Sequence, residues 1–438
     1  MNNLLLAYYG DDFTGSTDAL EFISNAGGKA MLFIKPPDAD TLKKYPDINV
    51  VGIAGLTRAL ATEELDMVLR DAFKKMKAYN ARHIHYKVCS TFDSSPTTGS
   101  IGRVIDIGKL IFENDIIPVI GGTPSLGRYC VFGNLFARMG IGSNGAIYRL
   151  DRHPSMSKHP TTPAYESDLR LHLQEQTNKK FGLIDVTQLQ KPIEEWCAVV
   201  ADEEVVLVDA LYEEQLVKIG EWLDDHIRKN KGTLFTVGSS AVEMALGFHW
   251  NNKGYTQPKT DWPQPSKAEP LLVLSGSYSP VTATQIKYAI ANGFVEVPLE
   301  MEASKNEEHE YFSLQCDIQS VFDALHNGKS VIIHSRNIDN GAKGLDAYAV
   351  GRLLGSIGKG VCEKIALKRI VVAGGDTSSY AARAMDIEAV EVIALSGVGA
   401  PLCKVHSSNP AINGIEVNFK GGQVGSEDYF IKLKNGNF

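Results

Sequence analysis

The chain has 438 residues, which is more than one ordinary hydrophobic core requires, so its length predicts at least two domains. Its hydrophobic and charged contents, 44% and 22%, are ordinary for a soluble globular protein. A formal net charge of −8 and the lack of a long basic run argue against a nucleic-acid partner. The six cysteines are scattered without CxxC spacing, which indicates reduced thiols rather than a disulfide framework or a zinc site.

The first residues, MNNLLLAYYGDD, show neither the basic region nor the long apolar run of a signal peptide. No stretch approaches about 18 consecutive apolar residues, so no membrane span is expected. Together with the cysteine pattern, these features predict a soluble, cytoplasmic protein that acts without a membrane.

Short apolar runs alternate with amphipathic segments through the first part of the chain. Helical spacing of apolar residues predicts helices over 61–79 and 212–230. This alternation is typical of an α/β domain in which helices cover a parallel sheet. Beyond the opening run, the predicted strands are 49–55, 116–122, 180–186, 204–210 and 233–239.

The composition changes over residues 251–270, which hold four prolines and few aliphatic side chains, as in a linker. The alternation then restarts, with predicted strands at 271–277, 294–299, 329–335, 369–375 and 391–397. We therefore expect an α/β protein of two domains, each a largely parallel sheet covered by helices, with an active-site cleft between them. The expected parts are a substrate-binding domain over 1–250, a linker over 251–269 and a nucleotide-binding domain over 270–438.

The opening apolar run ends in two adjacent carboxylates, Asp11 and Asp12, which precede a predicted helix. Like charges side by side disfavour ionisation unless a cation, a hydrogen-bond donor or a substrate hydroxyl compensates them. Ligands of α/β sheets bind at the carboxyl ends of strands. The two aspartates are therefore candidates for a catalytic site.

Polar side chains from two later segments are candidates for the same site. A lysine and an arginine near two aspartates can hold a carboxylate substrate while the aspartates engage its hydroxyls. A structural ion-pair network is the alternative interpretation. The candidate substrate-binding residues are Lys87, Ser90, Thr91, Asp93 and Arg128.

Three glycine-rich turns in the second half, within 273–286, 371–385 and 420–430, can present backbone N–H groups and hydroxyls to phosphates. None is followed by the G-K-[ST] of a Walker A loop. The alternatives are a helix capped by Asp376 or Thr377, and a plain loop near the C-terminus. The candidate nucleotide-binding residues are Ser275, Gly276, Ser277, Gly374, Gly375, Asp376, Thr377, Gly421, Gly422 and Gly425, with Lys420 as a nearby charge.

In order along nearly the whole chain, these stretches resemble the motifs of the four-carbon acid sugar kinase family. YYGDDFTGSTDAL resembles its opening D-D-x-T-G, TPSLGRYCVFGNLF its P-x-x-G-R segment, and TTPAYESDL its T-P-x-x-E-S-D-L stretch. TVGSSAVEMAL is similar to its V-G-S-x-G-L, VLSGSYSPVTATQI to its S-G-S-x-S, and VVAGGDTSSY to its G-G-[ED]-T.

The resemblance implies an ATP- and Mg²⁺-dependent kinase that phosphorylates the terminal hydroxyl of a short sugar acid, such as threonate, erythronate or a 3-oxo-tetronate. It implies that the N-terminal domain holds the acid and the C-terminal domain the nucleotide. One aspartate of the pair would accept the proton of the attacking hydroxyl and the other would orient the acid. We assign the base to Asp12; the metal-binding residues stay undefined.

Two motifs depart from the family pattern. Where the family has D-S-T-x-R-G, this chain has CSTFDSS, with Cys89 in place of the acid and Asp93 near the usual arginine. This reversal of charge suggests a different or larger acid, for example 3-oxo-isoapionate. The K-S-G-x-F-G segment is KGGQVG, which loses one phosphate-binding hydroxyl at Gly421 and keeps the glycine framework.

Two other functions stay open at the level of sequence. An α/β oxidoreductase would also use glycine turns after strands, but no G-x-G-x-x-G follows an early strand. A sugar-acid binding protein without catalysis would explain CSTFDSS, although binding an anion gives no reason for Asp11 and Asp12. The expected partner is a small-molecule sugar acid, with no nucleic acid and no membrane, and formation of a homo-oligomer stays open.

Overall fold

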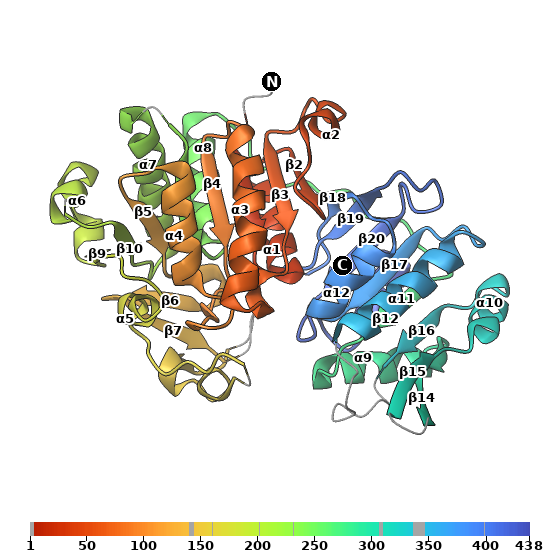
Figure 1. Ribbon diagram of the computed structural model, residues 1–438. Helices are drawn as coiled ribbons and strands as arrows, with labels where there is room; N and C mark the ends of the chain where they lie inside the picture. The colour runs from red at the N-terminus through yellow and green to blue at the C-terminus, as the bar shows by residue number, and fades with distance from the viewer. Residues whose placement is uncertain are drawn as a thin grey trace. The chain divides into compact units, whose positions relative to one another are not determined.

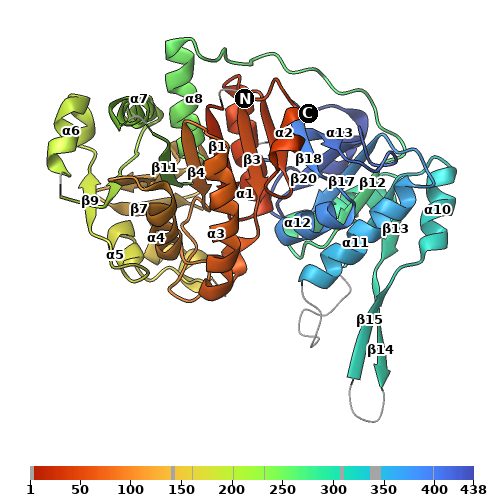
Figure 2. The same cartoon turned by 45° about the horizontal axis from the view of Figure 1, so that its top comes forward.

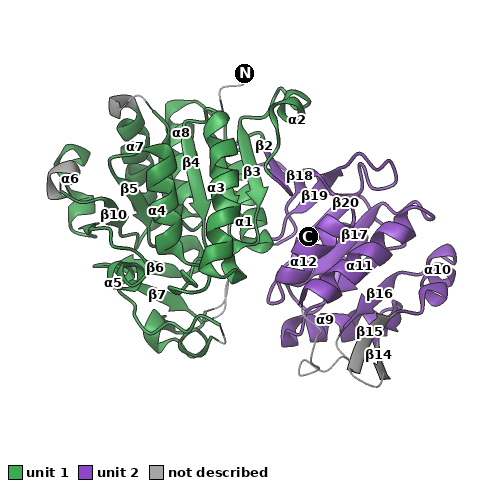
Figure 3. Ribbon diagram, viewed as in Figure 1, with its two compact units in different colours: residues 1–30, 36–259 green, residues 31–35, 260–438 purple. Residues whose placement is uncertain are grey.

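The computed structural model describes residues 4–139, 144–159, 161–200, 202–230, 232–305, 310–335, 347–397 and 399–438. The chain forms two compact units (Figure 3). Unit 1 comprises residues 1–30 and 36–259, and unit 2 comprises residues 31–35 and 260–438.

The main sheet of unit 1 is parallel throughout, as the alternation of apolar runs and helices predicts. Its strands are β1 (Leu6–Gly10), β3 (Val50–Ala54), β4 (His83–Lys87), β5 (Ile117–Ile120), β9 (Phe181–Ile184), β10 (Val205–Val208) and β11 (Leu234–Gly238). They lie in the order β3-β1-β4-β11-β5-β10-β9. The carboxyl ends of these strands therefore share one edge, where Asp11, Asp12 and the residues after Lys87 are placed.

Helices cover this sheet (Figure 1), with α3 packing on α4, and α8 packing on both α1 and α7. The packing follows from amphipathic spacing: in α3 the buried residues include Leu65, Leu69, Phe73 and Met76, which repeat at helical intervals. The helices are α1 (Phe13–Asn25), α2 (Ala39–Lys43), α3 (Thr62–Ala78), α4 (Ile101–Phe112), α5 (Leu169–Gln174), α6 (Ile193–Val199), α7 (Glu213–Asn230) and α8 (Ala241–Lys253).

Unit 1 also contains a small antiparallel sheet that the strand predictions missed. Its strands are β6 (Arg128–Val131), β7 (Asn134–Arg138) and β8 (Ile147–Arg149). The carboxylate of Asp209 accepts hydrogen bonds from the backbone N–H groups of Phe132 and Gly133, at 2.6 and 2.9 Å, and so fixes the turn between β6 and β7. This sheet carries Arg128 at its first position.

Unit 2 has a mixed sheet in the order β13-β16-β12-β17-β20-β19-β18-β2. Its strands are β12 (Leu272–Ser275), β13 (Val295–Pro298), β16 (Val331–His334), β17 (Arg369–Ala373), β18 (Ala389–Ala394), β19 (Leu402–His406), β20 (Glu416–Lys420) and β2 (Ala30–Phe33). The first five strands in this order, β13, β16, β12, β17 and β20, pair in parallel. The remaining pairs, β20 with β19, β19 with β18 and β18 with β2, are antiparallel. The prediction of a two-unit α/β fold with largely parallel sheets is confirmed, and the antiparallel strands are an addition to it.

The helices of unit 2 pack in two pairs, α11 with α12 and α9 with α13. Ile286 of α9 and Phe430 and Leu433 of α13 form one apolar core with Val273 and Val371 of the sheet. The helices are α9 (Pro280–Ala291), α10 (Ile318–His326), α11 (Ala347–Cys362), α12 (Gly375–Ala384) and α13 (Tyr429–Asn435), and a hairpin is formed by β14 (Glu300–Lys305) and β15 (Glu310–Gln315).

The proline-rich segment between α8 and β12, all of whose residues are described, contains no helix or strand (Figure 2). Of the helices in the described part of the chain, none is long and apolar enough to cross a membrane.

Candidate active site

Asp11 and Asp12 follow β1 at the carboxyl edge of the unit 1 sheet, and a single arginine binds both. Arg58 donates two hydrogen bonds to the carboxylate of Asp11, at 2.8 and 3.1 Å. Its third nitrogen lies 2.9 Å from Oδ2 of Asp12. Arg58 belongs to the turn after β3, the strand beside β1. The cation that compensates the two adjacent carboxylates is therefore part of the protein.

The two carboxylates differ in their surroundings. Asp11 is almost fully buried and also accepts a hydrogen bond from the backbone N–H of Cys89 at 3.2 Å. Burial raises the pKa of Asp11 above its ordinary value, Arg58 opposes this rise, and Asp12 adds to it. Asp12 caps helix α1, because its Oδ1 accepts the N–H of Gly15 at 2.7 Å. Asp12 is the more accessible of the two, with 19% of its side chain exposed against 4% for Asp11.

Lys87, the last residue of β4, points toward the same helix start. A Cβ atom on Gly15 would lie 2.4 Å from Nζ of Lys87 and 2.6 Å from Oδ1 of Asp12, so only glycine lets both groups approach this point. Nζ of Lys87 lies 3.9 Å from Oδ2 of Asp18, which also accepts the hydroxyl of Ser240. The ammonium group is thus held beside the aspartate pair by a buried carboxylate.

The segment CSTFDSS forms a short chain of contacts beside Asp11. Oγ1 of Thr91 donates to Asp93 at 2.7 Å and lies 3.0 Å from Sγ of Cys89. Burial raises the pKa of Cys89 to about 11, so its thiol is neutral near pH 7. Compared with the acid of the family motif, this position has lost a negative charge, and Asp93 carries one instead.

Arg128 joins this group through Ser90, whose hydroxyl accepts from Nε of the guanidinium at 3.1 Å. The side chain is buried, with 8% exposed, and it also donates to the carbonyl of Leu126 at 2.7 Å. Within the described ranges no carboxylate lies within ion-pair distance of it. The charges of Asp93 and Asp18 act on the guanidinium from beyond ion-pair distance, and a ligand carboxylate would give this buried cation a direct partner.

In unit 2 the three predicted glycine-rich turns come together, because they follow the neighbouring strands β12, β17 and β20. The N–H of Gly276 donates to the carbonyl of Ala373 at 3.1 Å, and the N–H of Gly374 to that of Lys420 at 2.9 Å. The hydroxyl of Thr282 donates to the carbonyl of Gly422 at 2.9 Å. The amide of Gln285 then bonds the carbonyls of Val424, Gly425 and Ser426, which fixes the last turn against α9.

Helix α12 begins at Gly375, with Gly374 at the N-cap and no side chain capping it. The interpretation in which Asp376 or Thr377 caps this helix is therefore wrong, since both residues lie inside its first turn. Gly374 has φ of 124°, and a Cβ there would lie 2.8 Å from Oγ1 of Thr377. A glycine turn leading to an uncapped helix start suits phosphate oxygens.

Lys420 ends β20 and is completely buried. Its Nζ donates to Oγ1 of Thr282 at 3.0 Å and lies 5.8 and 5.9 Å from the ring centres of Tyr429 and Phe430. Burial lowers the pKa of Lys420 to about 7. Among the described residues no carboxylate pairs with it, so it resembles Arg128 as a buried cation without an anion.

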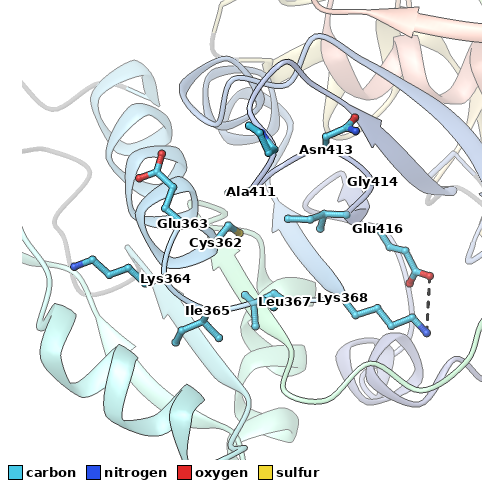
Figure 4. A pocket seen from close by; sticks show the side chains of 13 residues that line it. Cys362, Glu363, Lys364, Ile365, Leu367, Lys368, Ala411, Asn413, Gly414 and Glu416 are labelled. Atoms are coloured by element: carbon cyan, nitrogen blue, oxygen red, sulfur yellow. Dashed lines mark ion pairs between the residues drawn. The ribbon is translucent and has the colours of Figure 1, made fainter.

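A pocket of about 640 Å³ in unit 2 contains none of the predicted residues (Figure 4). It is lined in part by Cys362, Lys368 and Glu416, and the last two form an ion pair of 4.0 Å. Lys368 precedes β17 and Glu416 begins β20, so the pocket lies at the amino ends of the strands, whereas the glycine turns lie at the carboxyl ends.

Comparisons with known proteins divide the chain into two domains and show its family. A family model described as a sugar-binding N-terminal domain matches residues 6–246, and one described as a nucleotide-binding C-terminal domain matches residues 272–430. A 3-oxo-isoapionate kinase of Paraburkholderia graminis is 39% identical, over 99% of this chain and 94% of its own. The chain belongs to the four-carbon acid sugar kinase family. The prediction of an ATP-dependent sugar-acid kinase is thereby confirmed.

Proteins less similar in sequence also match this chain over nearly its full length. A 3-oxo-tetronate kinase of Cupriavidus necator is 24% identical and covers 97% of this chain and 95% of its own. A solved structure from Haemophilus influenzae superposes with a TM-score of 0.71 at 19% identity, covering 99% of this chain and 100% of that one. A Salmonella typhimurium structure gives a TM-score of 0.75 at 22% identity, covering 98% of each chain. At these identities the two structures show the fold alone.

The sequence did not indicate Arg58, Asp18 or Ser240 as site residues. Arg58 lies in LTRAL, directly after the predicted strand 49–55. Its position at a strand end could therefore have indicated it as a site residue. Asp18 and Ser240 are separated by 222 positions, and only the fold brings them together.

Proposed function

We propose that this kinase transfers the γ-phosphoryl group of ATP to the terminal hydroxyl of a branched 3-oxo sugar acid of the 3-oxo-isoapionate type. The observation that carries this proposal is the buried, unpaired guanidinium of Arg128 in the unit that also holds the Asp11–Asp12 pair. A relative named for this acid supports the choice of substrate, as does the neutral Cys89 in place of the family's acid.

Arg128 binds the carboxylate of the acid, and Lys87 binds an oxygen near Asp12. Arg58 and the N–H of Cys89 keep Asp11 fixed, so that Asp11 orients the acid. Asp12 accepts the proton of the terminal hydroxyl as its oxygen forms the new bond to phosphorus. The bond from phosphorus to the bridging oxygen breaks, and ADP leaves with that electron pair.

In unit 2 the phosphates of ATP lie over the glycine turns at Gly276, Gly374 and Gly422 and bind to the backbone N–H groups in the first turn of α12. The uncapped helix start and the turn at Gly374 fit an anionic ligand. In the described part of the chain no group of three His, Cys, Asp or Glu side chains could hold a metal ion by itself. Mg²⁺ usually binds through substrate phosphates and one or two carboxylates, and Asp376 in the first turn of α12 is the candidate ligand. Bound there, Mg²⁺ would neutralise phosphate charge.

The scattered spacing of the six cysteines, without a disulfide pattern, supports the proposed cytoplasmic location.

The test is ADP release in the presence of ATP and Mg²⁺ with a panel of acids: 3-oxo-isoapionate, 3-oxo-tetronate, threonate and erythronate. We expect the highest kcat/KM with the branched 3-oxo acid. A preference for an unbranched acid would contradict the proposed substrate while leaving the kinase assignment intact.

A further inference from the structure

Two serine hydroxyls at the carboxyl edge of the unit 2 sheet are buried and have no hydrogen-bond partner in the described ranges of the chain. Ser275 is the last residue of β12, and Ser335 directly follows β16. The two residues are neighbours, because the N–H of Ser335 donates to the carbonyl of Ser275 at 3.1 Å. Both have 0% exposure, so bulk solvent does not reach either hydroxyl.

A buried hydroxyl without a partner is destabilising, and native proteins contain few of them. Strand β16 shows the contrast at its other end. The hydroxyl of Ser330, just before the strand, accepts the N–H of Leu271 at 3.0 Å. The same strand is thus flanked by one satisfied serine at its amino end and one unsatisfied serine at its carboxyl end, and only the second lies on the edge that carries the glycine turns.

Ser275 and Ser335 lie at the same sheet edge as the three glycine turns, which form a row of candidate phosphate-binding segments after β12, β17 and β20. Ser275 leads into Gly276 and Ser277, and a Cβ on Gly374 would lie 3.4 Å from the backbone nitrogen of Ser277. Strand β16 is the neighbour of β12 on the side away from β17. Ser335 therefore extends the row by one strand, in a position that the sequence motifs did not indicate.

We propose that Ser335 is a further nucleotide-binding residue, whose hydroxyl, together with that of Ser275, binds an oxygen of the nucleotide's phosphate chain. The proposal rests on the proposed function, since it adds a residue to the same ATP site. The ligand supplies the partner that both hydroxyls lack, so the unsatisfied state of the free protein is relieved on binding.

The experiment compares Ser335→Ala with Ser330→Ala in the full-length protein, by calorimetric titration with ADP and by thermal unfolding without ligand. For Ser335→Ala we expect the Kd for ADP to rise about tenfold, because a hydrogen bond to a charged oxygen is lost. Its midpoint of unfolding should not fall, because the hydroxyl removed has no partner. Ser330→Ala should lower the midpoint, since the bond to Leu271 is lost, and leave ADP affinity unchanged.

An unchanged affinity for ADP in Ser335→Ala would overturn the inference. An equal loss of affinity for adenosine would also overturn it, since the hydroxyl would then bind the nucleoside and not the phosphates. Failure of the wild-type protein to bind ADP would instead contradict the proposed function, so the two failures are distinguishable.

Discussion

Asp12 has two structural duties besides its proposed role as base. One oxygen caps α1 through Gly15 and the other pairs with Arg58, so the carboxylate has a fixed orientation. Asparagine caps helices about as well as aspartate, because its side-chain oxygen accepts the same N–H. Replacement of Asp12 by asparagine therefore removes the base while it retains the cap.

For Asp12→Asn we expect kcat to fall roughly 10²- to 10⁴-fold, the usual contribution of a general base. The affinity for ATP should change little, because the nucleotide binds to the other unit. Steady-state kinetics and calorimetry measure the two quantities. Asp38→Asn is the matched control, since Asp38 caps the exposed helix α2 in the same way and lies outside the site. A kcat in Asp12→Asn equal to that of the wild type would exclude Asp12 as the base.

Lys420 predicts a proton linkage to nucleotide binding. Its pKa in the folded protein is lowered to about 7, below the ordinary 10.5, because burial disfavours the charged form. Below pH 7 the ammonium group is charged in both states, and its burial lowers the free energy of unfolding by the full amount. As the pH rises from about 7 to about 10.5, the folded protein has lost this proton while the unfolded chain still binds it, so the folded state becomes more stable. A bound phosphate favours the ammonium form and raises the pKa, so binding at pH 8 should take up a proton.

Calorimetry with ADP in buffers of different ionisation enthalpy measures this proton. We expect uptake approaching one proton at pH 8, little uptake at pH 6, and less at pH 8 in Lys420→Met. Buffer-independent binding enthalpies at pH 8 would show that the ammonium group does not sense the phosphates.

Single residues of the site were predictable to different degrees. Asp11, Asp12 and the glycines stand in local motifs directly after apolar runs, so their position at strand ends follows from the sequence. Arg58 stands at a strand end too, but nothing local indicates that its strand pairs with β1. That pairing depends on the order of strands in the sheet, which a single sequence does not specify.

At the scale of elements, we expect nucleotide binding to depend most on the turn between β17 and α12. Gly374 adopts φ of 124°, which side chains rarely tolerate, and a Cβ would meet Thr377. For Gly374→Val we expect the Kd for ATP to rise about tenfold or more, because the turn and its N–H donors must shift. Calorimetric titration with ATP measures this.

Gly328→Val is the control for Gly374→Val. Gly328 also has positive φ, 71°, but a Cβ there would meet nothing within 4 Å. It should lose some stability and keep its affinity for ATP. If Gly374→Val bound ATP as tightly as the wild type, the nucleotide site would lie elsewhere.

Among the elements, strands and helices with a clear apolar period were predicted, whereas β4 and β20, which lie inside their sheets, were not among the predicted strands. The predicted helix 61–79 is α3, and the predicted strand 369–375 contains β17. Strands β2, β14, β15 and β19 and the β6–β8 sheet were also missed. Strand β2 has only four residues and pairs with β18, which is distant in sequence, whereas the strands of the β6–β8 sheet are short and partly exposed.

At the scale of the whole molecule, the chain divides the proposed chemistry between its units. Unit 1 has a buried arginine and a carboxylate pair, and unit 2 has glycine turns and a buried lysine. Residues 31–35 belong to unit 2, so this unit is built from two separate parts of the chain. The composition change near residue 251 indicates the main boundary between the units, but nothing in the composition indicates that residues 31–35 belong to unit 2.

The central claim is that the terminal hydroxyl of a branched 3-oxo sugar acid receives the phosphoryl group. Phosphorus NMR of the product formed from ATP, Mg²⁺ and 3-oxo-isoapionate tests it most directly. We predict a new phosphate monoester signal, split by the two protons of the adjacent terminal carbon, that is absent with Asp12→Asn. A signal of inorganic phosphate alone, or a monoester split by one proton, would contradict the account.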